Sequence, residues 1–547
     1  MRRDSRTQSA RALARTLART LARTLAGTLA RVLLVTVAGG FATALNAQDT
    51  RVETASGNVE GALVDGIRSY KGIPFAAPPV GDRRWKPPQP VEAWGQRTLR
   101  AQSFGPECMQ TPYGAGSFFG GPPAPTAEDC LYLNVWTGAA DASERRPVMV
   151  WIHGGALTRG SGSTGIYDGT ALAEKGAVVV TINYRLGPFG YLAHPLLTAE
   201  SEHGSSGNYG VLDQVAALEW VRDNIAGFGG DPERVTIFGE SAGSWSVNTL
   251  MATPLAAGLF HRAIGQSGGR FGPMMRLSDA PEGGRSAEEI GAAFLGALGA
   301  ETLEEMRRLS AASVMAGLDR PAGRGFRTAE NVDGWVLPTD VTTAFAQGTH
   351  NNVPVLVGFN ADEMTSLSSP RSVPETLDAW REWVAGRVGD EAESFDAAYP
   401  VKEEGEIFDA FMRSRGDALF GIQMRTWARA SEAAGAGAWL YYFTHEPPGP
   451  AKDYLKSYHA AEIVYAFGNV GPGEREDADR QLAQTMSSYW VNFAANGDPN
   501  GAGLPPWPAY TRDSEAHLVL GPMVEAGSEL RTVQLDFWER RLRAGMP

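Results

Sequence analysis

The chain has 547 residues, of which 43% are hydrophobic and 20% are charged, and it contains 65 Gly and 34 Pro. This is the composition of a globular protein, and it excludes a disordered, collagen-like or coiled-coil chain. The 62 Asp and Glu outnumber the 49 Lys and Arg, so the formal net charge is −13. Phosphate backbones repel such a chain, and we expect no nucleic-acid partner.

The N-terminal segment 1–47 is predicted to be a signal peptide. Eight Arg precede or flank an apolar run from Val32 to Leu45, and small residues follow it. The run is shorter than the roughly 20 residues of a spanning helix, so we expect export and no stable membrane anchor. Arg-rich starts are also typical of transit peptides, which is the alternative. Removing the eight Arg and one Asp of this segment leaves a net charge of −20.

The chain has two cysteines, Cys108 and Cys130, which lack the paired CxxC or His spacing of a zinc site. A single disulfide between them fits an exported chain. Two buried free thiols are the alternative.

Alternating strands and helices are predicted along the remainder of the chain. Runs of β-branched and apolar residues indicate buried strands at 147–152, 177–182, 235–238, 353–357 and 439–443. Helical spacing is found at 211–225 and 478–495. This alternation predicts an α/β fold with a large, mostly parallel sheet, helices on both faces, and ligand groups at the carboxyl ends of strands.

No Ser/Gly/Pro-rich linker divides residues 48–547, so we expect a single domain. Segment 375–432 is rich in Trp, Phe and charged residues at helical spacing. We expect it to form helices inserted over the sheet, where they either cover the active site or only pack.

The pattern Gly-x-Ser-x-Gly occurs twice, around Ser241 and around Ser267. Ser241 follows the predicted strand 235–238 and precedes a plausible helix, which is the strand-turn-helix arrangement of a nucleophile elbow. Gly239 and Gly243 leave room for the close backbone contacts of such a turn. Ser267 precedes Gly-Gly-Arg-Phe-Gly-Pro, which cannot start a helix. We therefore predict Ser241 as the nucleophile, and Ser267 as a nearby loop residue or a structural serine.

The predicted strand 147–152 runs into His153-Gly154-Gly155-Ala156, a turn of small residues. Such turns direct backbone N–H groups at a developing oxyanion. The predicted donors are the N–H groups of Gly155, Ala156 and Ala242. Alone, the two glycines would indicate an ordinary turn, but the elbow downstream makes the pattern specific.

A serine nucleophile needs an imidazole that takes its proton and a carboxylate that orients the imidazole, in the chain order Ser, acid, His. His459 lies at a loop-to-helix junction, whereas His445 and His517 lie at or in strands. We therefore predict His459 as the base. Asp362 and Glu363 both follow the fourth predicted strand, and position alone does not separate them as the acid.

Together these residues resemble the type-B carboxylesterase/lipase family, the α/β-hydrolases that include bacterial para-nitrobenzyl esterases and the cholinesterases. The resemblance spans nearly all of 51–543 and includes further motifs at 128–135, 183–187, 228–232 and 490–499. It implies an α/β-hydrolase fold and a serine carboxylesterase that forms an acyl-enzyme without a metal or cofactor. The resemblance also implies that Glu363, the second residue of the Asp-Glu pair, is the acid. It further implies a disulfide between Cys108 and Cys130.

Other properties follow from the same resemblance. Cholinesterases bind choline through a Trp in the first disulfide loop, and residues 109–129 contain none, so choline esters are disfavoured. Tyr113, Phe118 and Phe119 lie in that loop and either line an aromatic pocket or pack within the loop. We also expect a monomer or weak homo-oligomer, and the predicted signal peptide implies that it is periplasmic or secreted. The alternatives are a catalytically silent adhesion protein of this fold, like the neuroligins, a lipase or an amidase.

Overall fold

The computed structural model describes residues 50–545 except 114–123, 281–283, 322 and 472–476. The predicted signal peptide, Phe118 and Phe119 lie outside the described residues. The chain from Arg51 onward forms one compact unit. Within the described part, no helix combines the length and apolar character needed to cross a membrane.

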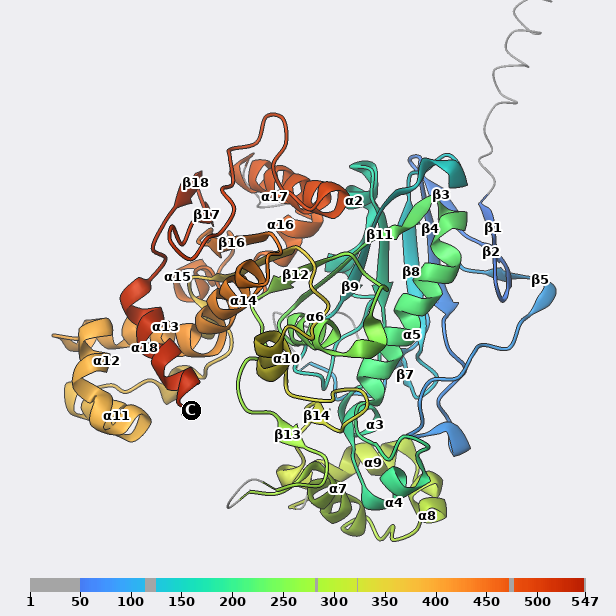
Figure 1. Ribbon diagram of the computed structural model, residues 1–547, viewed down its shortest axis with the longest axis horizontal. Helices are drawn as coiled ribbons and strands as arrows, with labels where there is room; N and C mark the ends of the chain where they lie inside the picture. Colours follow the sequence, from blue (N-terminus) through green and yellow to red (C-terminus); the bar gives the residue numbers. More distant parts are fainter. Residues whose placement is uncertain (1–49, 114–123, 281–283, 322, 472–476, 546–547) are drawn as a thin grey trace, which may run out of the picture. The chain divides into compact units, whose positions relative to one another are not determined.

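An eleven-stranded sheet runs through this unit in the order β18-β17-β16-β15-β12-β11-β9-β10-β8-β4-β3 (Figure 1). Neighbouring strands from β17 to β10 are parallel, whereas the remaining pairs at both edges are antiparallel. The prediction of a large, mostly parallel sheet is therefore confirmed. The strands are β3 (Ala62–Val64), β4 (Ile67–Pro74), β8 (Tyr132–Thr137), β9 (Arg146–Ile152), β10 (Val178–Ile182), β11 (Gly230–Glu240), β12 (Arg262–Gln266), β15 (Val355–Asn360), β16 (Ala438–Phe443), β17 (His517–Leu520) and β18 (Val524–Gly527).

Three smaller sheets accompany the large one. They contain β1 (Arg51–Thr54), β2 (Gly57–Glu60) and β5 (Gly95–Arg100); β6 (Glu107–Cys108) and β7 (Thr126–Ala127); and β13 (Met275–Arg276) and β14 (Asn331–Val332). The helices are α2 (Thr170–Glu174), α3 (Gly187–Tyr191), α4 (Pro195–Glu200), α5 (Tyr209–Asn224), α6 (Ala242–Ala252), α7 (Ala287–Gly296), α8 (Leu303–Arg308), α9 (Ala311–Gly317), α10 (Val341–Gln347), α11 (Leu377–Val388), α12 (Ala392–Ala398), α13 (Ile407–Gly416), α14 (Ile422–Ala433), α15 (Lys452–Leu455), α16 (Ile463–Phe467), α17 (Asp477–Asn496) and α18 (Thr532–Arg543). The helices predicted at 211–225 and 478–495 correspond to α5 and α17.

Helices cover both faces of the large sheet, as β9 illustrates. Val148 and Val150 pack in the hydrophobic cluster that includes α5 and α6, whereas Met149 and Trp151 pack in the cluster that includes α16 and α17. Successive side chains of a strand point to opposite faces, so both faces of β9 are buried. This explains why the strand is a continuous apolar run in the sequence.

The inserted segment 375–432 consists mainly of α11, α12, α13 and α14, and a π-helical turn, Asp417–Gly421, joins the last two. Helix α14 packs on β15 and β16, and α18 contacts α12, α14 and the π-helical turn. In Figure 1, α11 and α12 lie beside α18, away from β8 and β9. The expected inserted helices are therefore present.

Candidate active site

Ser241 lies in the turn between β11, which ends at Glu240, and α6, which begins at Ala242. Its backbone has φ 57° and ψ −122°, an unusual conformation for a residue with a side chain. The Ser241 N–H donates a 2.8 Å hydrogen bond to the Gln266 carbonyl at the end of β12. The strand-turn-helix geometry expected around Ser241 is thus present, and the strained turn is held by the neighbouring strand.

The glycines on either side of Ser241 have no room for a side chain. A Cβ at Gly239 would lie 2.5 Å from the Gly243 carbonyl carbon, and a Cβ at Gly243 would lie 2.0 Å from the Ile152 carbonyl oxygen. A carbon atom does not approach an atom to which it is not bonded this closely. The turn can therefore form against the end of β9 only with glycine at both positions.

The second Gly-x-Ser-x-Gly segment lies next to the first. Ser267 follows the end of β12, is fully buried and has φ 52°. No helix follows it, in agreement with the sequence. A Cβ at Gly268 would lie 2.3 Å from the Ser241 carbonyl oxygen, so this loop supports the backbone of the elbow.

The turn after β9 lies against the elbow from the other side. A Cβ at Gly154 would lie 3.1 Å from the Ser241 Cβ. Gly155 and Ala156 have φ values of 108° and 55°, and neither of their N–H groups has an acceptor among the described residues. Ala242, as the first residue of α6, presents its N–H at the helix start. The three predicted oxyanion donors thus come from two segments that meet beside Ser241.

His153, the first residue of this turn, packs against Tyr184. Its ring stacks on Tyr184 with 4.5 Å between centroids, and the Tyr184 hydroxyl donates a 2.8 Å hydrogen bond to the His153 carbonyl. Burial lowers the pKa of His153 to about 4, so its imidazole is neutral near pH 7. His153 therefore stabilises the turn as an uncharged, packed ring.

His459 and Glu363 are joined by a direct hydrogen bond. His459 Nδ1 lies 2.6 Å from Glu363 Oε2, and Glu363 Oε1 accepts a 2.8 Å hydrogen bond from the Asn360 N–H. Both side chains are almost completely buried, with exposures of 4% and 1%. The carboxylate therefore orients the imidazole, because both of its oxygens are fixed by hydrogen bonds.

Asp362, the other acid that position allowed, has a different partner. Its Oδ2 accepts a 3.3 Å hydrogen bond from the Ser457 N–H, and the Asp362 N–H donates to the Ser457 carbonyl. Burial raises the pKa of Asp362 above its usual value. Asp362 thus ties its own loop to the loop that precedes His459. The other two histidines lie elsewhere, His445 bonded to Asp479 and His517 within β17.

Two further carboxyl groups lie around the imidazole. Glu240 Oε1 lies 3.0 Å from His459 Nε2. Glu462 is fully buried and accepts hydrogen bonds from Gln266 at 3.1 Å and from Asn360 at 2.6 Å. Burial raises the pKa of Glu240 well above its usual value and also raises that of Glu462.

These carboxyl groups act on the protonation of His459. Burial lowers the pKa of His459, but attraction of the imidazolium to Glu240 and Glu363 outweighs burial and raises the pKa to about 9. The ring of Phe420, in the π-helical turn, lies 4.7 Å from the imidazole. The inserted segment thus reaches the site as well as packing on the sheet. A nucleophile turn, free N–H donors and an oriented imidazole together fit acyl transfer.

Comparison with known proteins places this geometry in a family. The model of the carboxylesterase family matches residues 48–538. The chain belongs to the carboxylesterase family. It is a carboxylic ester hydrolase, as its named relatives are.

The relatives cover most of this carboxylesterase. The fumonisin B1 esterase of Sphingopyxis macrogoltabida is 39% identical over 87% of this chain and 87% of its own. The para-nitrobenzyl esterase of Bacillus subtilis is 38% identical over 86% of this chain and 94% of its own. Among solved structures, a carboxylesterase of Geobacillus stearothermophilus has 36% identity and a TM-score of 0.76, over 91% of this chain and 100% of its own.

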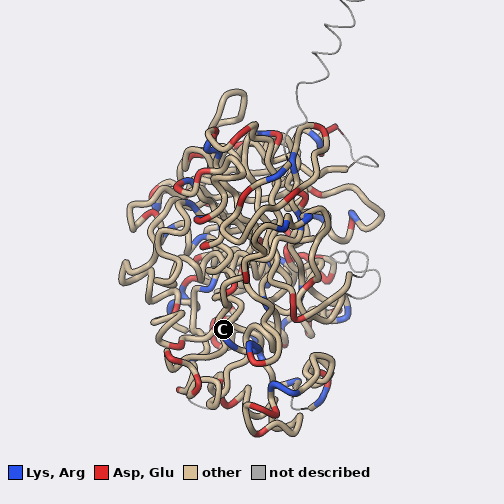
Figure 2. Tube along the Cα trace, turned by 90° about the vertical axis from the view of Figure 1, so that its right-hand side faces the viewer, with Lys and Arg blue, Asp and Glu red and all other residues tan. Residues whose placement is uncertain are grey.

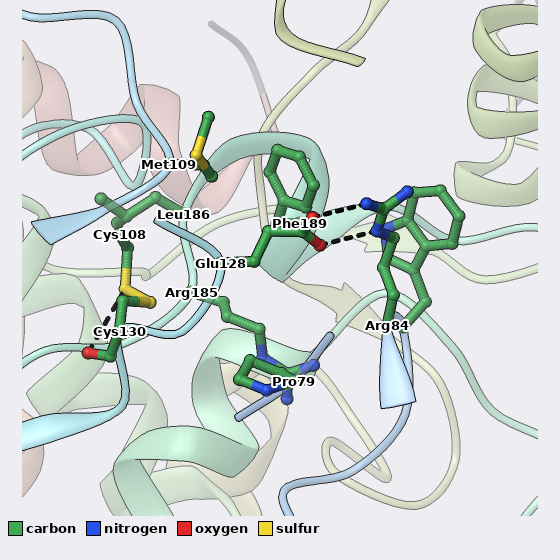
Figure 3. A pocket seen from close by; sticks show the side chains of 10 residues that line it. Pro79, Arg84, Cys108, Met109, Glu128, Cys130, Arg185, Leu186 and Phe189 are labelled. Atoms are coloured by element: carbon green, nitrogen blue, oxygen red, sulfur yellow. Dashed lines mark hydrogen bonds and ion pairs between the residues drawn. A yellow bond between two sulfur atoms is a disulfide. The ribbon is translucent and has the colours of Figure 1, made fainter. Parts of the chain in front are cut away.

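The carboxylesterase contains the expected disulfide between Cys108 and Cys130. Figure 3 shows this bridge beside a small cavity, with Arg84 bonded to Glu128 near it. Arg84 Nε donates a 2.6 Å hydrogen bond to Glu128 Oε2, and both side chains are largely buried. The ion pair and the disulfide together anchor the segment that enters β8.

Glu240 and Glu462 are the site residues that the sequence did not indicate. Glu240 is the residue before Ser241, and Glu462 follows His459 by three residues, so each lies near a predicted site residue in the sequence. A carboxyl group this near to Ser241 or His459 in the sequence was the signal that could have identified these two residues. In the described part of the chain, no group of three or more His, Cys, Asp or Glu is placed to hold a metal ion.

Proposed function

We propose that the chain is an exported serine carboxylesterase in which Ser241, His459 and Glu363 form the catalytic triad. The observation that carries the proposal is the 2.6 Å bond between His459 and Glu363 in a site that also contains the strained turn of Ser241. The substrate is a small carboxylic ester.

In the acylation step, the Ser241 Oγ attacks the ester carbonyl carbon and its proton passes to His459 Nε2. The carbonyl oxygen becomes an oxyanion, which accepts hydrogen bonds from the N–H groups of Gly155, Ala156 and Ala242. The intermediate collapses when His459 returns the proton to the leaving alcohol oxygen. The acyl group then remains on the Ser241 Oγ as an ester.

Deacylation repeats these steps with water as the nucleophile. His459 takes a proton from the water, the hydroxide oxygen bonds to the acyl carbon, and Ser241 leaves with the proton from the imidazolium. Glu363 stays bonded to His459 Nδ1 throughout and stabilises the imidazolium formed in each half of the reaction. The reaction balances with ester and water alone.

Hydrolysis of p-nitrophenyl acetate, butyrate and octanoate tests the proposal. Ser241→Ala should lose activity by several orders of magnitude, whereas Ser267→Ala, the matched control from the second Gly-x-Ser-x-Gly segment, should keep most of it. Mass spectrometry of a quenched reaction should find the acyl group on Ser241. Loss of activity in Ser267→Ala alone would overturn the assignment, and an inactive wild-type chain would favour a binding protein of this fold.

Export is tested separately by expressing the full chain and determining the N-terminus of the protein recovered outside the cytoplasm. A mature chain starting near residue 48, in the periplasm or the medium, is the expected result. An uncleaved chain retained in the cytoplasm would contradict export without affecting the triad.

A further inference from the structure

Two arginines face a cavity among the inserted helices. The cavity has a volume of about 410 Å³ and is lined by Ser372, Trp383, Arg387, Phe411, Arg415 and Leu419. Arg387 lies in the last turn of α11, and Arg415 lies in the last turn of α13. A second cavity of about 360 Å³ shares Arg387 and Leu419 and extends along Phe271 and Trp538.

These two guanidinium groups have no carboxylate partner among the described residues. The Arg387 guanidinium lies 5.9 Å from the centre of the Trp538 ring. Arg415 donates one 2.8 Å hydrogen bond to the Ser368 hydroxyl and lies 5.2 Å from the Phe411 ring. Burial lowers the pKa of each, and a neighbouring arginine lowers it further: Arg541 for Arg387, and Arg387 for Arg415.

Several other arginines of this acidic chain have a carboxylate partner. Basic and acidic residues are interspersed along the trace (Figure 2), and the buried Arg185 pairs with Asp213. Arg541, which borders the second cavity, bonds to Glu391. Half-buried, like-charged guanidinium groups without a counterion repel each other and are partly dehydrated, so an anion between them would be bound favourably. A planar carboxylate matches the fork of N–H donors on each arginine.

The segments that border the two cavities continue to the catalytic site. Leu419, which borders both cavities, precedes Phe420, whose ring contacts His459. On the other side, Gly268 lies against the Ser241 carbonyl, and Phe271 of the second cavity follows Gly268 by three residues. Three residues span at most about 10 Å, so the Phe271 side of the second cavity lies within about the length of a chain of several methylene groups from the elbow.

We infer that Arg387 and Arg415 form a carboxylate-binding subsite of this esterase, and that its preferred substrates are esters that carry a second, ionised carboxyl group. The apolar and aromatic side chains that line the two cavities would contact the connecting carbon chain. The inference rests on the proposed function, because it assumes hydrolysis at Ser241.

The test compares kcat/KM for esters with and without the distal carboxylate. On the acyl side, mono-p-nitrophenyl adipate and suberate are compared with p-nitrophenyl hexanoate and octanoate. On the alcohol side, 6-acetoxyhexanoate is compared with hexyl acetate in a pH-stat. In the Arg387→Gln, Arg415→Gln double variant, the charged-to-neutral ratio should fall at least tenfold for one pair of esters, chiefly through KM. Added salt should weaken the preference of the wild type.

Arg381→Gln is the matched control, because Arg381 is an exposed residue of α11 that pairs with Asp378 outside the cavity. It should leave the ratio unchanged. If the double variant does not fold, Arg387→Lys and Arg415→Lys keep the charge but lose the fork, and each should lower the ratio by a smaller factor.

The outcomes separate this inference from the proposed function. A ratio that is equal in the wild type and the arginine variants, for both the acyl and the alcohol series, overturns the carboxylate subsite while leaving the esterase intact. A wild-type chain that hydrolyses neither charged nor neutral esters overturns the proposed function itself.

Discussion

Glu240 Oε1 lies 3.0 Å from His459 Nε2, on the nitrogen opposite the one that bonds to Glu363. The residue that ends β11 therefore places its carboxyl group at the imidazole, and the next residue turns into the nucleophile elbow. Because Glu240 and His459 interact directly in a buried site, their protonation is coupled. The apparent pKa values therefore describe the pair and not either residue alone. The pH dependence of the enzyme should report this coupling.

We expect kcat/KM to rise with pH and to have its midpoint above 6.5, the ordinary value for an imidazole. Only neutral His459 can accept the serine proton, and the surrounding carboxylates raise its pKa to about 9, so activity is lost as pH falls below that pKa. A pH–rate profile with a neutral p-nitrophenyl ester measures the midpoint. Full activity at pH 4 would contradict a role for His459 as the base.

Removing a carboxyl group near His459 should move that midpoint to lower pH. In Glu240→Gln and in Glu462→Gln, a group that favours the imidazolium is lost, so the pKa of His459 falls. The same pH–rate profile measures both variants. Glu233→Gln is the control, since Glu233 lies on the same strand as Glu240 but its side chain is 76% exposed. A midpoint that stays fixed in Glu240→Gln would show that the pair is not coupled.

Glu363→Gln should reduce turnover about ten-thousandfold, by analogy with the Asp-to-Asn change in a serine protease triad. The amide cannot stabilise the imidazolium, although it preserves the shape of the site. Asp362→Asn should have a much smaller effect, because the Asp362 side chain bonds to the Ser457 N–H. Steady-state kinetics of the two variants, with thermal unfolding as the check on folding, decides between the acids. A crippled Asp362→Asn would reverse the assignment.

The parts of this architecture that could be predicted are those with local causes. Strand β9 is apolar on both faces because helices cover both, and the elbow glycines are needed where the chain turns at Ser241. Strand β12, Arg-Ala-Ile-Gly-Gln, was not predicted, because it is short and begins and ends with polar residues. Its buried Gln266 is satisfied by Glu462 and Trp490, which are distant in the sequence.

The unpredicted parts of the site also depend on contacts between residues that are distant in the sequence. Glu240 and Glu462 come from two segments, and only the folded sheet brings their carboxyl groups to the imidazole that the predicted Glu363 contacts. Arg387 and Arg415 lie on helices whose sequence pattern is that of solvent-facing charge. That neither arginine has a carboxylate partner among the described residues is a tertiary property that no sequence spacing reveals.

Gly243→Ala should destabilise the protein, although alanine has the higher helix propensity. The added Cβ would lie 2.0 Å from the Ile152 carbonyl oxygen, so the elbow and β9 must move apart, at a cost of about 1–3 kcal/mol or more. Gly296→Ala, in α7 with open space around its Cα, should be neutral or stabilising by up to about 1 kcal/mol. Thermal unfolding measures both changes. Equal unfolding midpoints for the two variants would contradict the close contact at the elbow.

Removing the Cys108–Cys130 disulfide should lower stability more than it lowers activity. The bridge closes a loop of 22 residues, and releasing that loop in the unfolded chain costs about 3 kcal/mol on the chain-entropy argument. The Cys108→Ser, Cys130→Ser double variant should therefore unfold at lower denaturant concentration, while its kcat at 25 °C stays close to that of the wild type. Reductant should shift the wild-type transition towards that of the variant and leave the variant itself unchanged. If reductant moves both transitions equally, the stabilisation does not come from this bridge.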